Sequence, residues 1–296
     1  MRKNIRWPIQ SLLFIPANRD DFISKASRYE PDAVILDLED ALPKSQLSAA
    51  RLRIKEQIQL LSTNQIKVFV RINSISEGGL DDLKHLVCKE LTGIVVPKIE
   101  TIEEVQLLDQ TLSYQEGLQQ IAQFSIDIIA LPETALGIYH SFEIAKASPR
   151  IQSVMTAVSG PVGGDIAKAV GYEATRDGLE QLYVEGKTVL ASKAGRAPYP
   201  IAGIIGADMN DLEYIEELIK RAKSIGFTGV ALIHPKHVAI ANRIFRLTEE
   251  EVTYHRQLIE SYEEGIKKGL GAVRFRDAMI DQAMYERSME LLSNQT

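Results

Sequence analysis

Three carboxylates lie within four residues directly after a short apolar run. Asp37, Glu39 and Asp40 follow Ala33–Leu36, and Pro43 stops further strand pairing. The run is rich in β-branched residues, as in a strand that is buried on both faces. Carboxylates beside such a strand cost desolvation free energy unless a cation neutralises them. Two interpretations stay open: a solvated strand-to-helix loop, and a metal or substrate site.

Eight short apolar runs recur along the chain, separated by segments long enough for helices. This alternation predicts parallel strands joined by right-handed crossovers, and eight such units predict a TIM (β/α)8 barrel. A doubly wound sheet is the main alternative, but its glycine-rich turn is missing, because Pro16, Ala17, Asn18 and Arg19 follow the first run. The predicted strands span residues 11–16, 33–39, 67–73, 93–98, 127–133, 153–160, 199–204 and 229–235.

The residues after the eighth strand predict a separate C-terminal helical arm. We expect a catalytic barrel over residues 1–245 and a helical extension over residues 246–296. A capping signature, Thr248 followed by Glu251, begins a charged helical pattern that continues to Lys268. Because a closed barrel needs no further element, this arm packs either on a neighbouring subunit or on its own barrel.

The composition limits the classes of function. The chain has 296 residues, is 45% hydrophobic and carries a formal net charge of -6, which argues against a nucleic-acid surface. Its single cysteine, Cys88, excludes a disulfide framework and a cysteine-rich zinc site. No signal-peptide pattern and no unbroken apolar run of membrane-spanning length occur, so we expect no membrane partner and a cytoplasmic location.

Polar side chains concentrate where the predicted strands end. In a TIM barrel these positions meet at the catalytic face, and a structural core would not need so many charges there. We expect Asn73 and Lys98 to contact substrate together with Arg71. The residues at these strand ends are Asn18, Arg19, Asp37, Glu39, Asp40, Arg71, Asn73, Lys98, Glu133, Asp165 and His234.

Glu133 and Asp165 end the neighbouring fifth and sixth units. Two oxygen ligands, with the other positions left to water and substrate, are how Mg²⁺ is commonly held. Arg71 could clamp a substrate carboxylate bidentately, and a metal beside it would stabilise an enolate or alkoxide of a 2-oxo acid. That is the chemistry of carbon–carbon lyases and aldolases. Lys98 keeps a Schiff base open, whereas zinc motifs and a GxSxG elbow are missing.

The sequence resembles the citrate lyase β-subunit family within the HpcH/HpaI aldolase superfamily. The resemblance begins with SLLFIPANRDDFISKA and DAVILDLEDALP. It continues in order through VFVRIN, GIVVPKIET, ALPETALGIYHSFEIAKASPRI, GFTGVALIHPKHV and AMID, and so covers nearly the whole chain.

The resemblance implies a Mg²⁺-dependent TIM barrel, usually a homotrimer or hexamer, that cleaves or forms hydroxyacyl-CoA thioesters. It implies that Glu133 and Asp165 ligate the metal, that Glu39 and Asp40 hold metal-bound waters, and that Arg71 binds the oxo-acid carboxylate. It also implies that each subunit lends Asp281 to its neighbour, where Asp281 acts on the acetyl-CoA methyl group. A helix N-cap is the alternative role of Asp281. The resemblance implies CoA-phosphate contacts for Asn18, Arg19 and Lys25.

Several positions depart from the pattern that many relatives share. Gln10 precedes Ser11 where an arginine is common, Asp165 follows two glycines instead of a glutamate, and Glu185 stands where an arginine is common. The seventh strand also lacks an aspartate. Less positive charge should weaken the binding of a substrate with several carboxylates, which favours citramalyl-CoA or malyl-CoA over citryl-CoA.

The leading hypothesis is therefore a lyase that cleaves a hydroxyacyl-CoA thioester to acetyl-CoA and a 2-oxo acid. Hydrolysis of a malyl-CoA-type thioester in the same site is one alternative. A β subunit that acts only within a citrate lyase complex with an acyl-carrier protein is another. A catalytically inactive binding barrel is the last.

Overall fold

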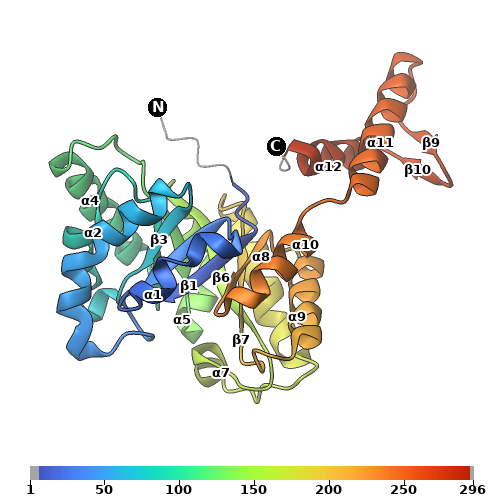
Figure 1. Ribbon diagram of the computed structural model, residues 1–296. Coiled ribbons are helices and arrows are strands. Elements are labelled where there is room, and N and C mark those ends of the chain that lie inside the picture. The colour runs from blue at the N-terminus through green and yellow to red at the C-terminus, as the bar shows by residue number, and fades with distance from the viewer. Residues whose placement is uncertain (1–6, 294–296) are drawn as a thin grey trace. The chain divides into compact units, whose positions relative to one another are not determined.

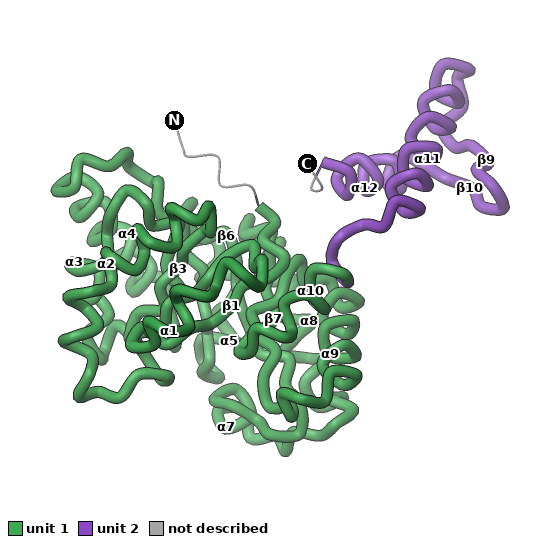
Figure 2. The backbone as a smooth tube through the Cα atoms, viewed as in Figure 1, with its two compact units in different colours: residues 1–243 green, residues 244–296 purple. Residues whose placement is uncertain are grey.

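The chain forms two compact units, residues 1–243 and residues 244–296 (Figure 2). The computed structural model describes residues 7–293. The division falls inside helix α10 (Val238–Phe245), whereas the sequence analysis placed the end of the barrel at residue 245. Each unit is described by itself below.

The first unit is a closed barrel of eight parallel strands, which confirms the predicted TIM-barrel fold. The strands pair in sequence order and β1 pairs with β8 to close the ring, so the barrel has no free edge. All eight predicted strands are present. They are β1 (Ser11–Pro16), β2 (Ala33–Asp37), β3 (Lys67–Arg71), β4 (Gly93–Pro97), β5 (Asp127–Leu131), β6 (Ile151–Ser159), β7 (Ile201–Ile205) and β8 (Gly229–Leu232).

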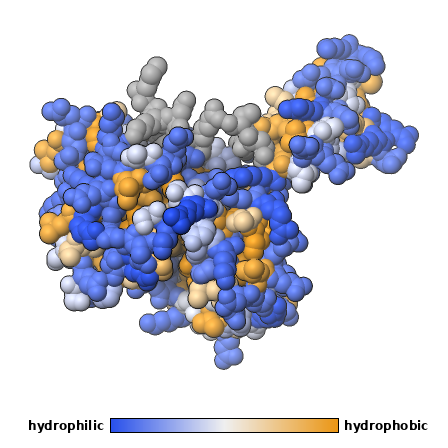
Figure 3. Space-filling model, viewed as in Figure 1, coloured by the Kyte–Doolittle hydropathy of each residue, from blue (hydrophilic) through white to orange (hydrophobic). Residues whose placement is uncertain are grey.

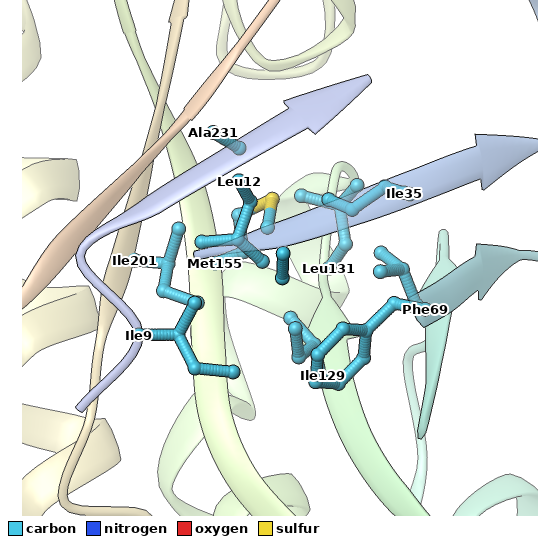
Figure 4. Packing of buried hydrophobic residues seen from close by; sticks show 11 residues of the cluster. Ile9, Leu12, Ile35, Phe69, Ile129, Leu131, Met155, Ile201 and Ala231 are labelled. Atoms are coloured by element: carbon cyan, nitrogen blue, oxygen red, sulfur yellow. The ribbon is translucent and has the colours of Figure 1, made fainter. Parts of the chain in front are cut away.

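Apolar side chains fill the barrel interior (Figure 4). Every strand contributes at least one buried residue, and Ile9, just before β1, joins them. This is the layered core expected of a TIM barrel, in which alternate positions of each strand point inward. The cluster consists of Ile9, Leu12, Ala33, Ile35, Phe69, Val95, Ile129, Leu131, Met155, Ile201 and Ala231.

Helices surround the strands (Figure 1). Helix α9 is typical: Asp211 caps its first turn, and Tyr214, Ile215 and Leu218 are buried on one face. On the face shown in Figure 3, hydrophilic residues predominate between small apolar patches. The helices of this unit are α1 (Asp20–Ile23), α2 (Leu47–Thr63), α3 (Gly79–Leu86), α4 (Ile102–Leu118), α5 (Ala135–Tyr139), α6 (Ser141–Lys146), α7 (Asp165–Val170), α8 (Leu182–Ala194), α9 (Leu212–Ile225) and α10.

A fully buried arginine ties helix α4 to the start of β6. Arg150 donates to both carboxylate oxygens of Glu116 at 2.8 Å and to Asp109 Oδ1 at 2.6 Å. It also donates to the Ser113 hydroxyl at 2.9 Å. Charges removed from water need such complete pairing, because an unpaired buried charge costs several kcal/mol.

The second unit is a helical pair with a short hairpin. It contains α11 (Glu249–Lys267), β9 (Val273–Phe275), β10 (Ala278–Ile280) and α12 (Gln282–Ser293). The predicted capping box is present, since Thr248 accepts from the amide of Glu251 at 3.2 Å and the Glu251 side chain accepts from the amide of Thr248 at 2.8 Å. No helix among residues 7–293 is long and apolar enough to cross a membrane.

Replacing Arg150 with alanine should remove the main cation of the buried Glu116 carboxylate and of the half-buried Asp109 carboxylate. We expect the free energy of unfolding to fall by about 3–5 kcal/mol, as for other broken buried ion pairs. Urea denaturation measures the change. Lys84→Ala, which breaks an exposed pair with Asp81, is the control and should have a much smaller effect. Equal effects of the two substitutions would contradict this account of Arg150.

Candidate active site

A bidentate ion pair joins the carboxyl ends of β2 and β3. The two strands are in register there, with Asp37 directly opposite Arg71. Arg71 Nε donates to Asp37 Oδ1 at 2.7 Å and Nη2 donates to Oδ2 at 2.6 Å. Asp37 also accepts from the amides of Glu39 and Ala41 at 3.0 and 3.2 Å. With only 2% and 12% of the two side chains exposed, the pair is fixed in position.

Three further cation contacts extend this pair into a cluster. Arg71 Nη1 lies 3.1 Å from Glu39 Oε2, and Lys98 Nζ donates to Glu39 Oε1 at 2.7 Å. Lys98 Nζ also lies 3.6 Å from Asp165 Oδ2. The backbone of Lys98 is left-handed (φ 53°), which is uncommon for a non-glycine residue. We call the set Asp37, Glu39, Asp40, Arg71, Lys98, Glu133 and Asp165 the rim cluster.

A cavity of about 440 Å³ opens beside the rim cluster. Glu133 and Asp165, the two predicted metal ligands, both line it. The complete lining is Phe14, Pro16, Asp37, Asp40, Ala41, Arg71, Leu131, Glu133, Met155, Thr156, Ala157, Gly164, Asp165, Gly203, Ile205 and Ile233. The carboxyl ends of the strands therefore bring charged and apolar groups to one hollow, as TIM-barrel enzymes do.

The Glu133 carboxyl group lacks a charge partner of its own. Its Oε2 is buried and has no hydrogen-bond partner. Burial raises the pKa of Glu133 to about 8; the Arg71 charge lowers it, and the Glu39 charge raises it further. Burial also raises the pKa of Glu39, although Arg71 opposes this. At neutral pH this half of the cavity thus favours an additional cation.

The cations of the cluster are held firmly in their charged form. Burial lowers the pKa of Arg71, but hydrogen bonds and the charge of Asp37 more than offset this, so the net change is upward. Burial likewise lowers the pKa of Lys98, but the hydrogen bond to Glu39 and the charges of nearby carboxylates raise it by more, so the net change is upward. Neither side chain can act as a proton acceptor near neutral pH, so Lys98 is poorly suited to form a Schiff base.

The loops after β6 and β7 hold Asp165 at the cavity. Gly160 N donates to Ile205 O at 2.9 Å, and Val162 N donates to Gly206 O at 3.1 Å. Gly206 has φ +70°, and a Cβ there would lie 1.9 Å from Val162 O, so only glycine allows this approach. Helix α7 then begins at Asp165 itself.

The carboxylates present suit a divalent cation that retains several of its coordinated water molecules. No group of three or more His, Cys, Asp or Glu residues among residues 7–293 forms a ready-made metal site. Of the four described carboxylates that line the cavity, Glu133 has an orphaned oxygen; with Glu133 and Asp165 as the two ligands, most coordination positions are left to water and substrate. This donor set fits a hard cation bound through oxygen.

The structure places the other predicted residues outside the cavity lining. Asn73 is buried, and its side chain donates to Asp82 Oδ2 at 2.9 Å and to Leu38 O at 3.2 Å. Asn18 donates to Gln46 Oε1 at 2.7 Å. Arg19 forms two hydrogen bonds with Asp21, and Lys25 is exposed. Their substrate and CoA contacts stay predictions.

Asp281 belongs to the second unit. It is exposed, and its Oδ1 accepts from Met284 N at 3.2 Å, so it caps the start of helix α12. This is the alternative role considered from the sequence. Its action in a neighbouring subunit stays a prediction.

Asp37 occupies the Nε–Nη2 edge of Arg71. The sequence also allows this structural role, in which Arg71 pairs with a neighbouring carboxylate. The bidentate clamp of Arg71 on a substrate carboxylate stays a prediction.

The fold and this cavity define a TIM-barrel enzyme with an acid-rich catalytic face. The chain belongs to the HpcH/HpaI aldolase/citrate lyase family, whose sequence profile matches residues 10–235. Membership places it among the lyases, as its relatives are also named.

Two curated relatives match nearly the whole chain. A citrate lyase subunit beta-like protein of Deinococcus radiodurans is 30% identical over 296 residues, which cover 97% of each chain. The mitochondrial citramalyl-CoA lyase of Homo sapiens is 26% identical and covers 97% of this chain and 85% of the relative.

Two solved structures of the CitE protein from Mycobacterium tuberculosis are similar to this fold. The complex with magnesium, acetoacetate and coenzyme A has a TM-score of 0.75 at 24% identity, covering 98% of this chain and 99% of that chain. The complex with magnesium and pyruvate has a TM-score of 0.64 at 26% identity, covering 83% and 94%.

Removing the Glu133 charge should change how stability depends on pH. The folded-state pKa of about 8 exceeds the ordinary value of 4.5. The contribution of Glu133 to the free energy of unfolding is therefore fully present below pH 4.5 and is lost as the pH rises toward 8. Relative to Glu133→Gln, the metal-free wild type should therefore lose up to about 1.4 kcal/mol per pH unit in this window. Urea unfolding in EDTA at several pH values measures the difference.

Glu143→Gln, at an exposed carboxyl group outside the cavity, is the matched control for this experiment. Its stability difference from wild type should be nearly constant with pH. A difference between Glu133→Gln and wild type that is equally constant would contradict the raised pKa of Glu133.

Proposed function

We propose that this chain is a Mg²⁺-dependent carbon–carbon lyase that cleaves a hydroxyacyl-CoA thioester to acetyl-CoA and a 2-oxo acid. The observation that carries the proposal is the Glu133 carboxyl group. It has a buried oxygen without a hydrogen-bond partner and a pKa raised by burial, and it shares one cavity with Asp165 and Arg71. The relatives support the same reading, since one is named citramalyl-CoA lyase and a neighbour was solved with magnesium and pyruvate. Candidate substrates are citramalyl-CoA, malyl-CoA and citryl-CoA.

Glu133 and Asp165 would hold the Mg²⁺ ion, and Glu39 and Asp40 would hold its waters. When bound, the ion supplies a Lewis acid for the oxygen that carries negative charge in the reaction. Arg71 is fixed by Asp37, so it offers its remaining N–H groups to the oxo-acid carboxylate in a preset direction. Positioning of this kind costs no reorganisation during the reaction.

The chemistry is a retro-aldol cleavage. A carboxylate of the rim cluster, Glu39 or Asp40, accepts the proton of the substrate hydroxyl group. The carbon–oxygen bond becomes a carbonyl, the carbon–carbon bond breaks, and its electron pair passes to the acetyl-CoA enolate. Asp281 of a neighbouring subunit, or water, returns a proton to the enolate carbon to give the acetyl-CoA methyl group.

Glu133→Gln and Asp165→Asn should abolish cleavage, because each removes a charged ligand. Turnover of citramalyl-CoA, malyl-CoA and citryl-CoA, with Mg²⁺ or with EDTA, measures activity, and calorimetry of Mg²⁺ binding measures the site directly. We expect at least a 1000-fold loss of kcat/KM and loss of Mg²⁺ binding, with the fold intact by circular dichroism. Full turnover in EDTA would overturn the proposal.

The products of the same assay separate the alternatives. Formation of a 2-oxo acid with acetyl-CoA identifies a lyase, whereas free hydroxy acid with CoA identifies a thioesterase. Activity only after addition of an acyl-carrier protein would identify a β subunit that needs a citrate lyase complex. Several relatives are named citrate lyase subunit beta.

A homotrimer or hexamer in which Asp281 serves a neighbouring subunit makes a distinct prediction. Glu133→Gln and Asp281→Asn homo-oligomers should each be inactive or strongly impaired. Co-expressed mixtures should regain up to about a quarter of wild-type activity, because some sites then combine an intact Glu133 with an intact Asp281. Activity of mixtures that never exceeds the parent variants would exclude the sharing of Asp281 between subunits.

A further inference from the structure

The cavity has one apolar side that the proposed chemistry leaves unused. The charged side consists of rim-cluster residues, whereas β6 and β7 contribute Met155, Ala157, Gly203 and Ile205. We call these four residues the apolar wall. A pocket with one polar and one apolar side fits a ligand that has the same two sides.

The strand register places this wall next to the interior core. Met155 pairs with Ile201, and both belong to the interior core cluster. Two residues further along, Ala157 pairs with Gly203. Both residues of this second pair line the cavity, and Ala157 also packs against Ile138, Ile166 and Val184.

Gly203 is not required by the backbone. A Cβ at Gly203 would lie 3.8 Å from Thr156 O and 3.9 Å from Ala157 Cα, which are ordinary contacts. Gly206 differs, since a Cβ there would collide with Val162 O. The missing side chain at Gly203 therefore serves to leave space in the cavity rather than to relieve strain.

This side of the cavity has no cation to offer. Among the described residues that line the cavity, Arg71 is the one cationic side chain, and Asp37 occupies its Nε–Nη2 edge. Lys98 Nζ is directed to Glu39. A carboxylate against the apolar wall would lose its hydration without gaining a cation, whereas a methyl group would gain from burial.

We propose that the apolar wall binds the substituent on the carbonyl carbon of the released 2-oxo acid and selects a small uncharged group, a methyl. This inference rests on the proposed lyase function. It makes citramalyl-CoA, which yields pyruvate, the preferred substrate. Malyl-CoA would leave the wall unfilled, and citryl-CoA would press a carboxylate against it.

Initial rates with the three thioesters and Mg²⁺ test the order of preference. We expect kcat/KM for malyl-CoA to be about 4-fold below that for citramalyl-CoA, the value of one buried methyl-sized group. For citryl-CoA we expect a loss of about 100-fold or more. A kcat/KM for citryl-CoA equal to or above that for citramalyl-CoA would overturn the inference while leaving the lyase function in place.

Variants of Gly203 test whether the wall sets this order. Gly203→Ala and Gly203→Val should lower the ratio of citramalyl-CoA to malyl-CoA cleavage, by about 10-fold for valine. Gly186→Ala in helix α8, where a Cβ would meet nothing within 4 Å, is the matched control and should leave the ratio unchanged. Ile205→Arg should raise the ratio of citryl-CoA to citramalyl-CoA cleavage. An unchanged ratio in a folded Gly203→Val protein would assign the wall to another part of the substrate.

Binding of the free oxo acids tests the wall without turnover. Calorimetry with Mg²⁺ should show tighter binding of pyruvate than of oxaloacetate or glyoxylate, and Gly203→Val should weaken pyruvate binding most. If no thioester is cleaved but this order holds, the lyase proposal fails and the wall stands. If thioesters are cleaved and oxaloacetate binds more tightly than pyruvate, the wall fails and the lyase proposal stands.

Discussion

The buried pair of Asp37 and Arg71 constrains the rest of the catalytic face. Two charges are taken almost completely out of water there, which is favourable only with full hydrogen bonding. Two guanidinium N–H groups and two backbone amides meet this need at Asp37. The pair also joins the ends of β2 and β3, so the direction of the remaining Arg71 N–H groups follows from the barrel itself.

Fixing Arg71 in this way leaves the other carboxylates short of positive charge. Glu39 forms ion pairs with both Arg71 and Lys98. Glu133, in contrast, has a buried oxygen without a hydrogen-bond partner and a pKa raised by burial. The carboxylates at the strand ends therefore outnumber the cations available to them, and the apolar wall adds no charge. A cavity with fixed charges on one side and an apolar surface on the other fits a small substrate that has one charged and one apolar end.

The barrel was predictable because its signal is local. Each strand of a parallel barrel is buried on both faces and leaves a short apolar run, and all eight runs were found. The hairpin of β9 and β10 was missed, since three-residue strands leave no periodic pattern. Glu133 and Asp165 could be placed at one cavity because strand ends converge. The wall at Gly203 depends on register and on empty space, which are tertiary properties and leave little trace in sequence.

The raised pKa of Glu133 links stability to ligand binding. Burial raises the pKa of this carboxyl group, so it ionises less readily in the folded protein, and a nearby cation would favour its ionisation. Cation binding would thus release a proton and remove a source of instability at the same time. The charges of Arg71 and Lys98 lower the pKa of Glu133 only in part, since Arg71 is held by Asp37 and Lys98 by Glu39. The same bonds that fix the site in the folded chain therefore leave Glu133 without a cation of its own.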